Sequence, residues 1–426
     1  MPGPVIYLVR SWPRLSQTFI LDELLALERR GVEVALFSLV PSGETIVQSR
    51  VAAVRAPVRY LAEPLPPLRR RIAGQLRVAR HSPRRYLRTW WYARSRPSLS
   101  AGYSTCSTRR CFGHAVQVAA AVLDMHRAAR PPSHIHAHFA HDPALVALLV
   151  HRLTGLSYSL TAHARDLYQI PGASLAARTA DATAVVTCCA VNAEYIATTV
   201  PAQQRAPVHV LHHGLELDRF VPSPSPARST PPVLLSVGRL VAKKGFDVLF
   251  EALARLKRDG ILFKLRLYGD GPLRAELAAQ CTELGIEENV RMLGECSQGQ
   301  VRDALAQADL FVLTPRVTPD GDRDGIPNVL VEAMACGLPV VTTSAGGVTE
   351  LVRHGINGLV SRPNDVEGIA SHLRELLNNP RLGQDLAAAA RRTVEADYDV
   401  NTAAAELERL FSHAAAAPGV APVGAT

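Results

Sequence analysis

The sequence VLLSVGRLVAKKGFD at residues 233–247 carries the pattern of a strand, a tight turn and a helix. An apolar run ends at Gly238, basic side chains follow, and an amphipathic pattern begins at Phe246. Two cations at the carboxyl end of a parallel strand, beside the first amides of a helix, suit a diphosphate. Arg239 and Lys244 are therefore candidate phosphate ligands. Solvated charge on a loop is the alternative interpretation.

Short β-branched runs alternate with helical patterns on both sides of this stretch. In the second half we expect strands at 233–237, 263–268, 290–293, 310–313 and 340–343, and helices at 246–259, 273–284, 301–307, 329–335, 366–377 and 382–396. In the first half we expect strands at 5–9, 32–39, 135–137, 158–161, 184–187 and 208–212, and helices at 18–30, 143–153 and 191–199. The predicted fold class is α/β, with two doubly wound, Rossmann-like domains.

A proline-rich segment, VPSPSPARSTPP at residues 221–232, separates the two patterns. Proline lacks the amide donor that a helix or a central strand requires, so this segment is a predicted linker. We expect an N-terminal domain at residues 1–220 and a C-terminal domain at residues 233–396. A further helix is expected at residues 397–413, followed by a flexible tail at 414–426.

The composition is that of a globular protein, with 47% apolar and 20% charged residues among 426. These proportions exclude disorder, collagen and coiled coil as the bulk state. No uninterrupted apolar run reaches 18 residues and residues 1–13 lack a signal-peptide pattern, so a cytoplasmic protein is expected. Seven scattered cysteines without a CxxC pair predict neither a disulfide framework nor a structural zinc site.

The most informative stretch is DGDRDGIPNVLVEAMACGLP at residues 320–339. Asp324 and Glu332 lie eight positions apart, on either side of a loop that opens a helix at about Asn328. A carboxylate one turn into that helix can bind two vicinal ribose hydroxyls, while the loop amides face a sugar or a phosphate.

A calcium loop is the alternative interpretation of this stretch. Asp320, Asp322, Asp324 and Gly325 match the first half of an EF-hand pattern. The twelfth position is Val331 rather than glutamate, so we disfavour calcium. The turn YGDGP at residues 268–272 is likewise no dinucleotide fingerprint, because a long arginine side chain occupies its third glycine position.

Together, SVGRL, KKGFD, YGDGPL, DGIPNVLVEAMACGLPVV and AGGVTELV resemble the donor domain of GT-B glycosyltransferases of the glycosyltransferase 4 family. In the first half, PRLSQTFILDEL, HIHAHFAHDPALVALLV and TAHARDLY are similar to motifs of exopolysaccharide and colanic-acid-type members. The resemblance implies two domains facing a central cleft. It also implies retaining transfer from a nucleotide-diphosphate sugar to a glycan or lipid-linked hydroxyl in bacterial surface glycan synthesis, with no cofactor and no essential metal. A soluble natural-product acceptor, or a non-catalytic sugar-nucleotide-binding protein, is the alternative.

The resemblance also assigns roles by position in the motifs. The implied catalytic residues are His163, Arg239, Lys244 and Asp324. The implied donor-binding residues are Gly238, Arg239, Lys244, Gly269, Gly271, Asp324, Gly325, Ile326, Pro327, Asn328 and Glu332. The implied acceptor-side residues are Ser16, Gln17, His138, His163, Arg165 and Asp166. Two positions depart from the family pattern, because Gln17 and Asp324 stand where close relatives usually carry glutamate. The resemblance also implies that the last helix crosses back to the first domain.

Three histidines, His134, His136 and His138, alternate onto one face of a predicted strand. Metal binding is one interpretation of this pattern. No acidic or cysteine residue of convincing spacing completes a metal site, so we favour a structural and acceptor-side role.

The net charge of +9 is unevenly distributed, because residues 64–123 contain no aspartate or glutamate. With Trp90 and Trp91 nearby, residues 69–110 are a candidate contact with an anionic membrane surface or a lipid-linked acceptor. A solvated pair of basic helices is the alternative, and no nucleic-acid-binding module accompanies the charge. The segment contains Arg69, Arg70, Arg71, Arg77, Arg80, Arg84, Arg85, Arg88, Arg94, Arg96, Arg109 and Arg110.

Overall fold

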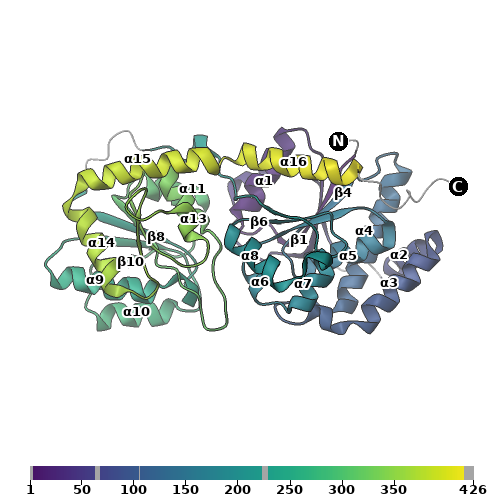
Figure 1. Cartoon of the computed structure of the whole chain (residues 1–426), viewed down its shortest axis with the longest axis horizontal. Coiled ribbons are helices and arrows are strands. Elements are labelled where there is room, and N and C mark those ends of the chain that lie inside the picture. The colour runs from purple at the N-terminus through teal and green to yellow at the C-terminus, as the bar shows by residue number, and fades with distance from the viewer. Residues whose placement is uncertain (1–2, 63–67, 105, 223–228, 417–426) are drawn as a thin grey trace. The chain divides into compact units, whose positions relative to one another are not determined.

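The computed structural model describes residues 3–62, 68–104, 106–222 and 229–416 (Figure 1). The chain divides into two compact units. Unit 1 comprises residues 1–211 together with residues from 403 on, and unit 2 comprises residues 212–402. In the described part of the chain, no helix is both long enough and apolar enough to cross a membrane.

Unit 1 contains a seven-stranded parallel sheet in the order β3-β2-β1-β4-β5-β6-β7. The strands are β1 (Val5–Trp12), β2 (Val34–Pro41), β3 (Val58–Tyr60), β4 (His134–His138), β5 (Tyr158–Ala162), β6 (Ala184–Thr187) and β7 (Val208–Val210). The helices are α1 (Thr18–Arg29), α2 (Leu68–His81), α3 (Pro83–Ser95), α4 (Thr108–Arg127), α5 (Asp142–Thr154), α6 (Arg165–Tyr168), α7 (Gly172–Thr179) and α8 (Ala190–Thr199). The strand order reverses between β1 and β4, as in a doubly wound fold.

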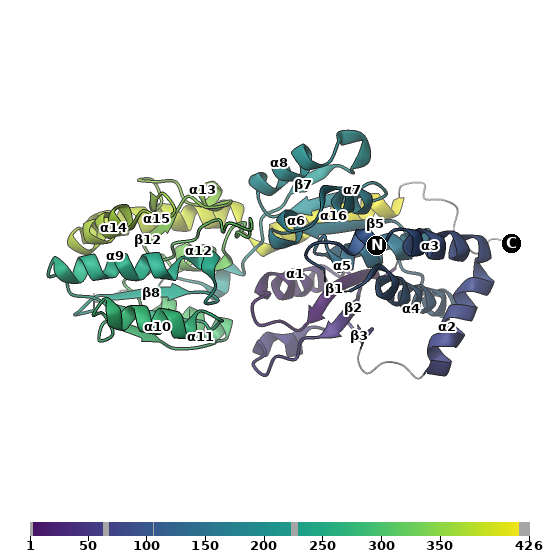
Figure 2. The ribbon, with the colours of Figure 1, turned by 90° about the horizontal axis from the view of Figure 1, so that it is seen from below.

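Unit 2 contains a six-stranded parallel sheet in the order β10-β9-β8-β11-β12-β13. The strands are β8 (Val233–Val237), β9 (Lys264–Tyr268), β10 (Val290–Met292), β11 (Leu310–Val312), β12 (Val340–Thr343) and β13 (Leu359–Ser361). The helices are α9 (Phe246–Arg258), α10 (Arg274–Glu283), α11 (Gln298–Leu305), α12 (Asn328–Ala335), α13 (Val348–Leu351), α14 (Val366–Asn378) and α15 (Pro380–Asp397). Helices lie on both sides of each sheet (Figure 2), so the predicted α/β class with two doubly wound sheets is confirmed.

Burial on both faces explains why the central strands could be predicted from the sequence. Tyr158–Ala162 and Val340–Thr343 are buried at every position, as expected for parallel strands covered by helices on both faces. Their runs are apolar or β-branched, and the parallel pairing satisfies their backbone polar groups.

The division between the units differs from the expected boundary at residue 220. The backbone amide of Leu215 donates to the Tyr398 carbonyl at 2.7 Å, and the Val400 amide donates to the Leu215 carbonyl at 3.1 Å. Phe220 is fully buried. Because these contacts attach residues 212–220 to the end of α15, the chain divides after Leu211, and the described parts of the expected linker also belong to unit 2.

The final helix, α16, covers Val400–Ala416, so it begins and ends three residues later than the expected helix at 397–413. Its residues from Ala403 on group with unit 1. Phe411 is fully buried there, with its ring centroid 5.0 Å from that of His136 and 6.2 Å from that of Tyr7. The expected tail therefore begins as helix, and residues 417–426 lie outside the described part of the chain.

Candidate functional site

Two lysines and two aspartates form a charge cluster at the carboxyl ends of the central strands of unit 2. The Lys244 ammonium lies 2.6 Å from Asp324 Oδ2. The Lys243 ammonium lies 3.3 Å from Asp324 Oδ1 and 3.0 Å from Asp322 Oδ1. Both lysines come from the turn between β8 and α9, and both aspartates come from the loop between β11 and α12. In doubly wound sheets this is where the strand order reverses and where ligands bind.

The cluster is held away from water, which strengthens its electrostatics. The side chains of Lys243, Lys244 and Asp324 are 7%, 13% and 16% exposed. Burial alone would raise the pKa of the Asp324 carboxyl, but the charges of Lys244 and then Lys243 outweigh burial and hold that pKa well below its usual value. Asp324 is therefore an anion at neutral pH. Lys244 and Asp324 were both expected at the donor site, but their pairing was not. The roles of Lys243 and Asp322 were not predicted either, although the paired lysines of KKGFD were a visible signal.

Arg239 lies in the loop that follows β8, and its side chain is exposed. Among the described residues, its guanidinium makes no hydrogen bond or ion pair. The loop is fixed by backbone bonds, because the Gly238 amide donates to the Tyr268 carbonyl and the Leu240 amide to the Asp270 carbonyl, each at 2.9 Å. Backbone hydrogen bonds therefore join the turn after β8 to the turn after β9.

Gly269 is required by the close approach of these two turns. Its φ is +129°, and a Cβ at this position would lie 1.9 Å from the Gly238 carbonyl oxygen. Only glycine, which has no Cβ, can occupy this position with this backbone conformation and this contact. The Gly-rich turn thus brings backbone against backbone.

A second glycine turn, which contains Gly346, packs against the backbone of the loop that carries Asp324. Gly346 has a φ of +61°, and a Cβ there would lie 2.1 Å from the Asp324 carbonyl oxygen. The next amide, of Gly347, donates to the Gly325 carbonyl at 3.0 Å. Gly346 was not among the expected site residues, although it lies in the AGGVTELV motif.

Helix α12 begins at Asn328, as expected, with Pro327 preceding it. Glu332 lies in its second turn and is only 5% exposed. Gln298, at the start of α11, donates from Nε2 to Glu332 Oε1 at 2.9 Å. Burial, and after it the charge of Glu332, raises the pKa of the nearby Cys336 thiol to about 12. Glu332 is therefore an ordered, buried carboxylate, and Gln298 is a partner that the sequence did not reveal.

A chain of hydrogen bonds joins four aromatic and acidic side chains in unit 1, from Tyr7 within β1 to the carboxyl ends of β4 and β5. The Tyr7 hydroxyl donates to Glu23 Oε1 at 2.6 Å, and the same oxygen lies 2.7 Å from His138 Nε2. His138 Nδ1 lies 3.3 Å from His163 Nε2, and the two rings stack with an interplanar angle of 13°. The structure thus brings His138 and His163 together, and adds Glu23 of α1, which lies in the PRLSQTFILDEL motif.

Asp166 connects the loops after β4 and β5. It is 2% exposed and accepts hydrogen bonds from the backbone amides of Ala140 at 2.7 Å and His163 at 3.1 Å. Burial raises the pKa of Asp166 despite these amides. Its geometry is that of a residue that positions the His163 backbone. Its neighbour Arg165 is exposed and lies over the Tyr103 ring, 4.4 Å from the ring centroid.

Ser16 and Gln17 lie at the beginning of α1, as the motif suggested. Ser16 is exposed. The side-chain oxygen of Gln17 is buried and has no hydrogen-bond partner among the described residues. Unit 1 therefore presents a polar group at the start of α1 as well as the histidine pair.

The remaining histidines of β4 bond to hydroxyls of β5 and of Ser157, which precedes β5. His134 lies 2.9 Å from Ser157 Oγ and 2.8 Å from Ser159 Oγ, and His136 lies 2.8 Å from Ser159 Oγ and 2.9 Å from Thr161 Oγ1. Burial lowers the pKa of His134 to about 3. These rings are neutral and fully bonded, which favours the structural interpretation.

A metal site can still be considered in unit 1. Ligand atoms of Glu23, His136 and His138 lie within 4.8 Å of one another. Both nitrogens of His136, however, already bond to hydroxyls of β5. A metal ion would have to break one of these bonds, so the donor set fits a metal poorly.

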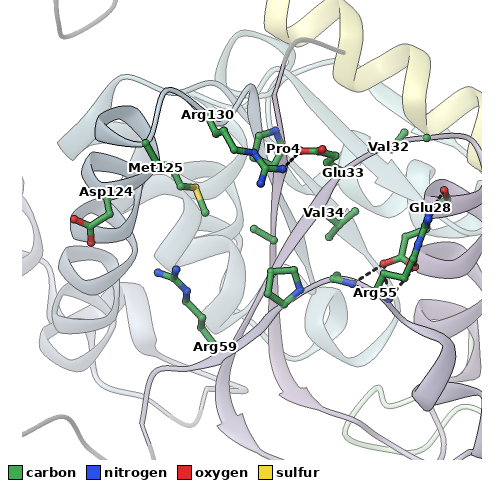
Figure 3. A pocket seen from close by; sticks show the side chains of 15 residues that line it. Pro4, Glu28, Val32, Glu33, Val34, Arg55, Arg59, Asp124, Met125 and Arg130 are labelled. Atoms are coloured by element: carbon green, nitrogen blue, oxygen red, sulfur yellow. Dashed lines mark hydrogen bonds and ion pairs between the residues drawn. The ribbon is translucent and has the colours of Figure 1, made fainter.

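A cavity of about 720 Å³ lies elsewhere in unit 1, around the amino ends of β1 and β2 (Figure 3). Its charged groups bond to the protein itself, because Arg130 lies 2.6 Å from Glu33 and Glu28 accepts from the Ala56 amide at 2.7 Å. The strands are parallel, so this cavity lies at the opposite edge of the sheet from His138. It is not part of the candidate site.

Residues 219–393 match the family model described as glycosyl transferases group 1. This segment contains the charge cluster, the glycine turns and Glu332. This segment is therefore similar to the group 1 glycosyl transferases.

Curated relatives to which the chain is similar are named as glycosyltransferases. The chain is 33% identical over 220 residues to the amylovoran biosynthesis glycosyltransferase AmsK of Erwinia amylovora, covering 52% of this chain and 53% of the relative. It is 36% identical over 209 residues to the putative colanic acid biosynthesis glycosyltransferase WcaL of Escherichia coli, covering 49% and 51%. The chain thus spans about half the length of the curated relatives it matches.

Solved structures share the fold of this chain along nearly its whole length. Anabaena Alr3699/HepE, solved in complex with UDP and glucose, has a TM-score of 0.70 at 18% identity, covering 96% of this chain and 99% of that one. Sucrose-phosphate synthase of Thermosynechococcus elongatus has a TM-score of 0.70 at 17% identity, covering 96% and 98%. The expected GT-B fold, with its two Rossmann-like sheets, is therefore confirmed.

Proposed function

We propose that the chain is a retaining glycosyltransferase. It moves a sugar from a nucleotide-diphosphate sugar to a hydroxyl of a glycan or lipid-linked acceptor in bacterial exopolysaccharide or surface glycan synthesis. The observation that carries the proposal is the buried cluster of Lys243, Lys244 and Asp324 at the switch point of a group 1 glycosyl transferase segment. The names of AmsK and WcaL, and the UDP and glucose bound to Alr3699/HepE, support the donor and the pathway class.

The lysines supply the electrostatic part of the proposed reaction. When the bond to the sugar breaks, negative charge develops on the diphosphate. Lys244 and the exposed Arg239 would stabilise this charge, and a largely buried cation does so more strongly than one in water. Asp324 orients Lys244 before the donor arrives and would then face the hydroxyls of the donor sugar. These cations and the helix-start amides provide charge stabilisation without a metal or a cofactor.

Glu332 would bind the ribose of the donor nucleotide. A carboxylate can accept hydrogen bonds from two vicinal hydroxyls, and the Gln298 bond at 2.9 Å fixes its orientation. In the proposed reaction the acceptor hydroxyl attacks from the face that the diphosphate leaves. Its proton passes to the leaving phosphate oxygen, so a new glycosidic bond replaces the old one with retained configuration. His163 and His138 would lie on the acceptor side.

Thermal unfolding tests the donor assignment directly. The wild type and Glu332→Ala would be heated with UDP, GDP or ADP, with and without magnesium. A ligand at 100 times its dissociation constant stabilises by about 2.7 kcal/mol, which is visible as a shift in Tm. We expect one nucleotide to stabilise the wild type without magnesium and Glu332→Ala to lose that shift. Glu251→Ala, which changes an exposed glutamate of α9, is the control. Stabilisation by no nucleotide, or an undiminished shift in Glu332→Ala, would count against the proposal.

A further inference from the structure

We infer that the outward face of the α2–α3 hairpin in unit 1 binds the surface of an anionic lipid bilayer. The hairpin face comprises exposed apolar side chains, Ile72, Leu76, Leu87, Trp90 and Trp91, and exposed arginines, Arg69, Arg71, Arg80, Arg84, Arg88 and Arg94. The inference concerns a partner that the charge cluster of unit 2 does not involve, and it does not rest on the proposed transfer reaction.

Helix periodicity points the apolar side chains away from the body of unit 1. On α3, Thr89 is buried, and Leu87 and Trp91 each lie two positions away from it. At 3.6 residues per turn, two positions correspond to a rotation of about 160° away from the buried side. On α2, Leu76 has the same relation to buried Val78, and Ile72 lies one turn before Leu76.

These side chains are exposed to an unusual degree for their size. Trp91 is 64% and Leu87 is 61% exposed, Ile72 and Leu76 are each 49% exposed, and Trp90 is 43% exposed. Five large apolar residues within two adjacent helices form a concentrated patch rather than scattered single exposures. Such patches mark interaction surfaces, because each side chain gains by leaving water.

The charge around the patch selects an anionic partner. No aspartate or glutamate occurs between residues 64 and 123. Asp124 follows this stretch, but it is paired with Arg77 at 2.7 Å, and Arg77 is not on the outward face. The arginines of the hairpin face are therefore not neutralised by neighbouring residues of the hairpin. Their charge complements lipid phosphates, while the tryptophans and aliphatic side chains suit the boundary between headgroups and acyl chains.

The combination of exposed arginines, tryptophans and aliphatic side chains on the hairpin face favours a bilayer over a nucleic acid as the partner. A nucleic acid would use the arginines and could stack on the tryptophans, but it offers nothing to Ile72, Leu76 and Leu87. A bilayer accommodates all three classes of side chain. The hairpin is also well supported as a docking surface, because it packs on α4 and α5 (Figures 1 and 2). The Tyr86 hydroxyl joins the two helices through Gln75 Oε1 at 2.6 Å.

The test uses the full chain with vesicles of phosphatidylcholine, alone or with about 30% phosphatidylglycerol. Binding is measured by co-sedimentation and by tryptophan emission. Trp12 is the third tryptophan of the chain and is already buried at 3% exposure, so a blue shift reports on Trp90 and Trp91. We expect binding and a blue shift with anionic vesicles only, and weaker binding in about 0.5 M salt, which screens the arginines.

Two variants separate the parts of the hairpin face. Arg84→Glu with Arg88→Glu should weaken binding by at least about tenfold, because two favourable charges are reversed. Leu87→Ser with Trp91→Ser should reduce binding and most of the blue shift. The matched controls are Arg258→Glu, an exposed arginine of α9, and Leu262→Ser, a leucine of unit 2 that is 71% exposed. Both controls should bind like the wild type.

Several outcomes would overturn the inference. Equal binding to neutral and anionic vesicles would remove the role of charge, and equal binding by the hairpin variants and the controls would remove this face. Binding to duplex DNA with none to anionic vesicles would assign the surface to nucleic acid. If a hairpin variant fails to fold, quenching of wild-type emission by brominated phospholipid decides the matter, and absence of quenching contradicts the inference. Nucleotide-induced stabilisation of the same samples tests the proposed function separately.

Discussion

At the scale of single residues, the candidate site depends on charges that the fold brings close and shields from water. Lys244 and Asp324 are eighty positions apart in sequence and 2.6 Å apart in space. The aspartate holds Lys244 in place, and the shielding strengthens the effect of the lysine on an incoming diphosphate. A single substitution can therefore remove much of the proposed catalytic effect.

Replacing Lys244 with alanine should lower the rate of sugar transfer by roughly 10²-fold or more, the usual effect of removing one pre-oriented charge-stabilising group. The assay would measure release of nucleoside diphosphate from a sugar donor that carries the nucleotide found to stabilise the wild type. Lys264→Ala, at an exposed position where β9 begins, is the control. A rate within twofold of wild type, on the order of 0.4 kcal/mol of barrier, would remove Lys244 from this role.

The buried His134 should make the protein sensitive to mild acid. Its pKa is about 3 in the folded chain because burial disfavours the imidazolium, and the unfolded chain titrates near pH 6.5. Above pH 6.5 both states are neutral and the effect is absent. As pH falls from 6.5 towards 3, the unfolded chain takes up the proton first and stability declines. At pH 5 the loss from this residue is about 2 kcal/mol.

Urea unfolding at pH 7 and pH 5 would measure this loss. His134→Gln should be less stable than wild type at pH 7, because the glutamine amide cannot reproduce both ring hydrogen bonds. Its further loss between the two pH values should be smaller than that of wild type. His126→Gln, at an exposed position of α4, should follow the wild type. An identical pH dependence in His134→Gln and wild type would be inconsistent with a neutral, buried His134.

At the scale of elements, the turns after the strands were easier to predict than the helices of the first unit. Strands such as Val233–Val237 and Ala184–Thr187 have the predicted bounds because continuous burial leaves a continuous apolar run. The edge strands Val58–Tyr60 and Leu359–Ser361 were not predicted, because three residues give little periodicity. The equally short edge strands β7 and β10 were predicted only as parts of longer runs, at 208–212 and 290–293. From the sequence, a pair of helices is only one interpretation of the basic segment at residues 69–110. The many arginines of α2 and α3 obscure the few positions that pack against the rest of unit 1.

Replacing Gly346 with alanine should displace the loop that carries Asp324. The new Cβ would lie 2.1 Å from a backbone oxygen, in addition to the strain of a φ of +61°. We expect a loss of about 2 to 3 kcal/mol in stability and weaker nucleotide binding. Gly285→Ala is a matched control, because its φ is +64° and no atom lies within 4 Å of the new Cβ.

The control separates backbone strain from the clash. Gly285→Ala should lose only about 1 kcal/mol, and its nucleotide-induced shift in Tm should be unchanged. Chemical denaturation and nucleotide titration would be run on both variants. Equal effects of the two substitutions on nucleotide binding would mean that the contact between Gly346 and the Asp324 loop has no part in the site.

At the scale of the whole molecule, unit 1 is completed by residues distant in sequence. It takes in α16 from Ala403 on, whereas unit 2 is the continuous stretch 212–402. Phe411 of α16 is fully buried, and its ring lies 5.4 Å from that of His134 and 5.0 Å from that of His136. The C-terminal helix is thus part of the core of unit 1.

Replacing Phe411 with alanine should therefore destabilise unit 1 by about 3 to 5 kcal/mol, the usual cost of emptying a buried phenylalanine site. Calorimetry of the full chain would assign the transitions, with a bound nucleotide marking the transition of unit 2. Only the other transition should move to lower temperature. A shift confined to the nucleotide-sensitive transition would contradict the grouping of α16 with unit 1.

The sequence by itself determined the α/β class, the two doubly wound sheets and the motifs that mark the switch point of unit 2. It could do so because periodicity, turn glycines and short motifs are local properties. Tertiary structure alone decided that Lys243 and Asp322 join the charge cluster, that Gln298 holds Glu332, and that residues 212–220 belong to the second unit. Each of these depends on which distant part of the chain approaches a residue, and no local pattern contains that information.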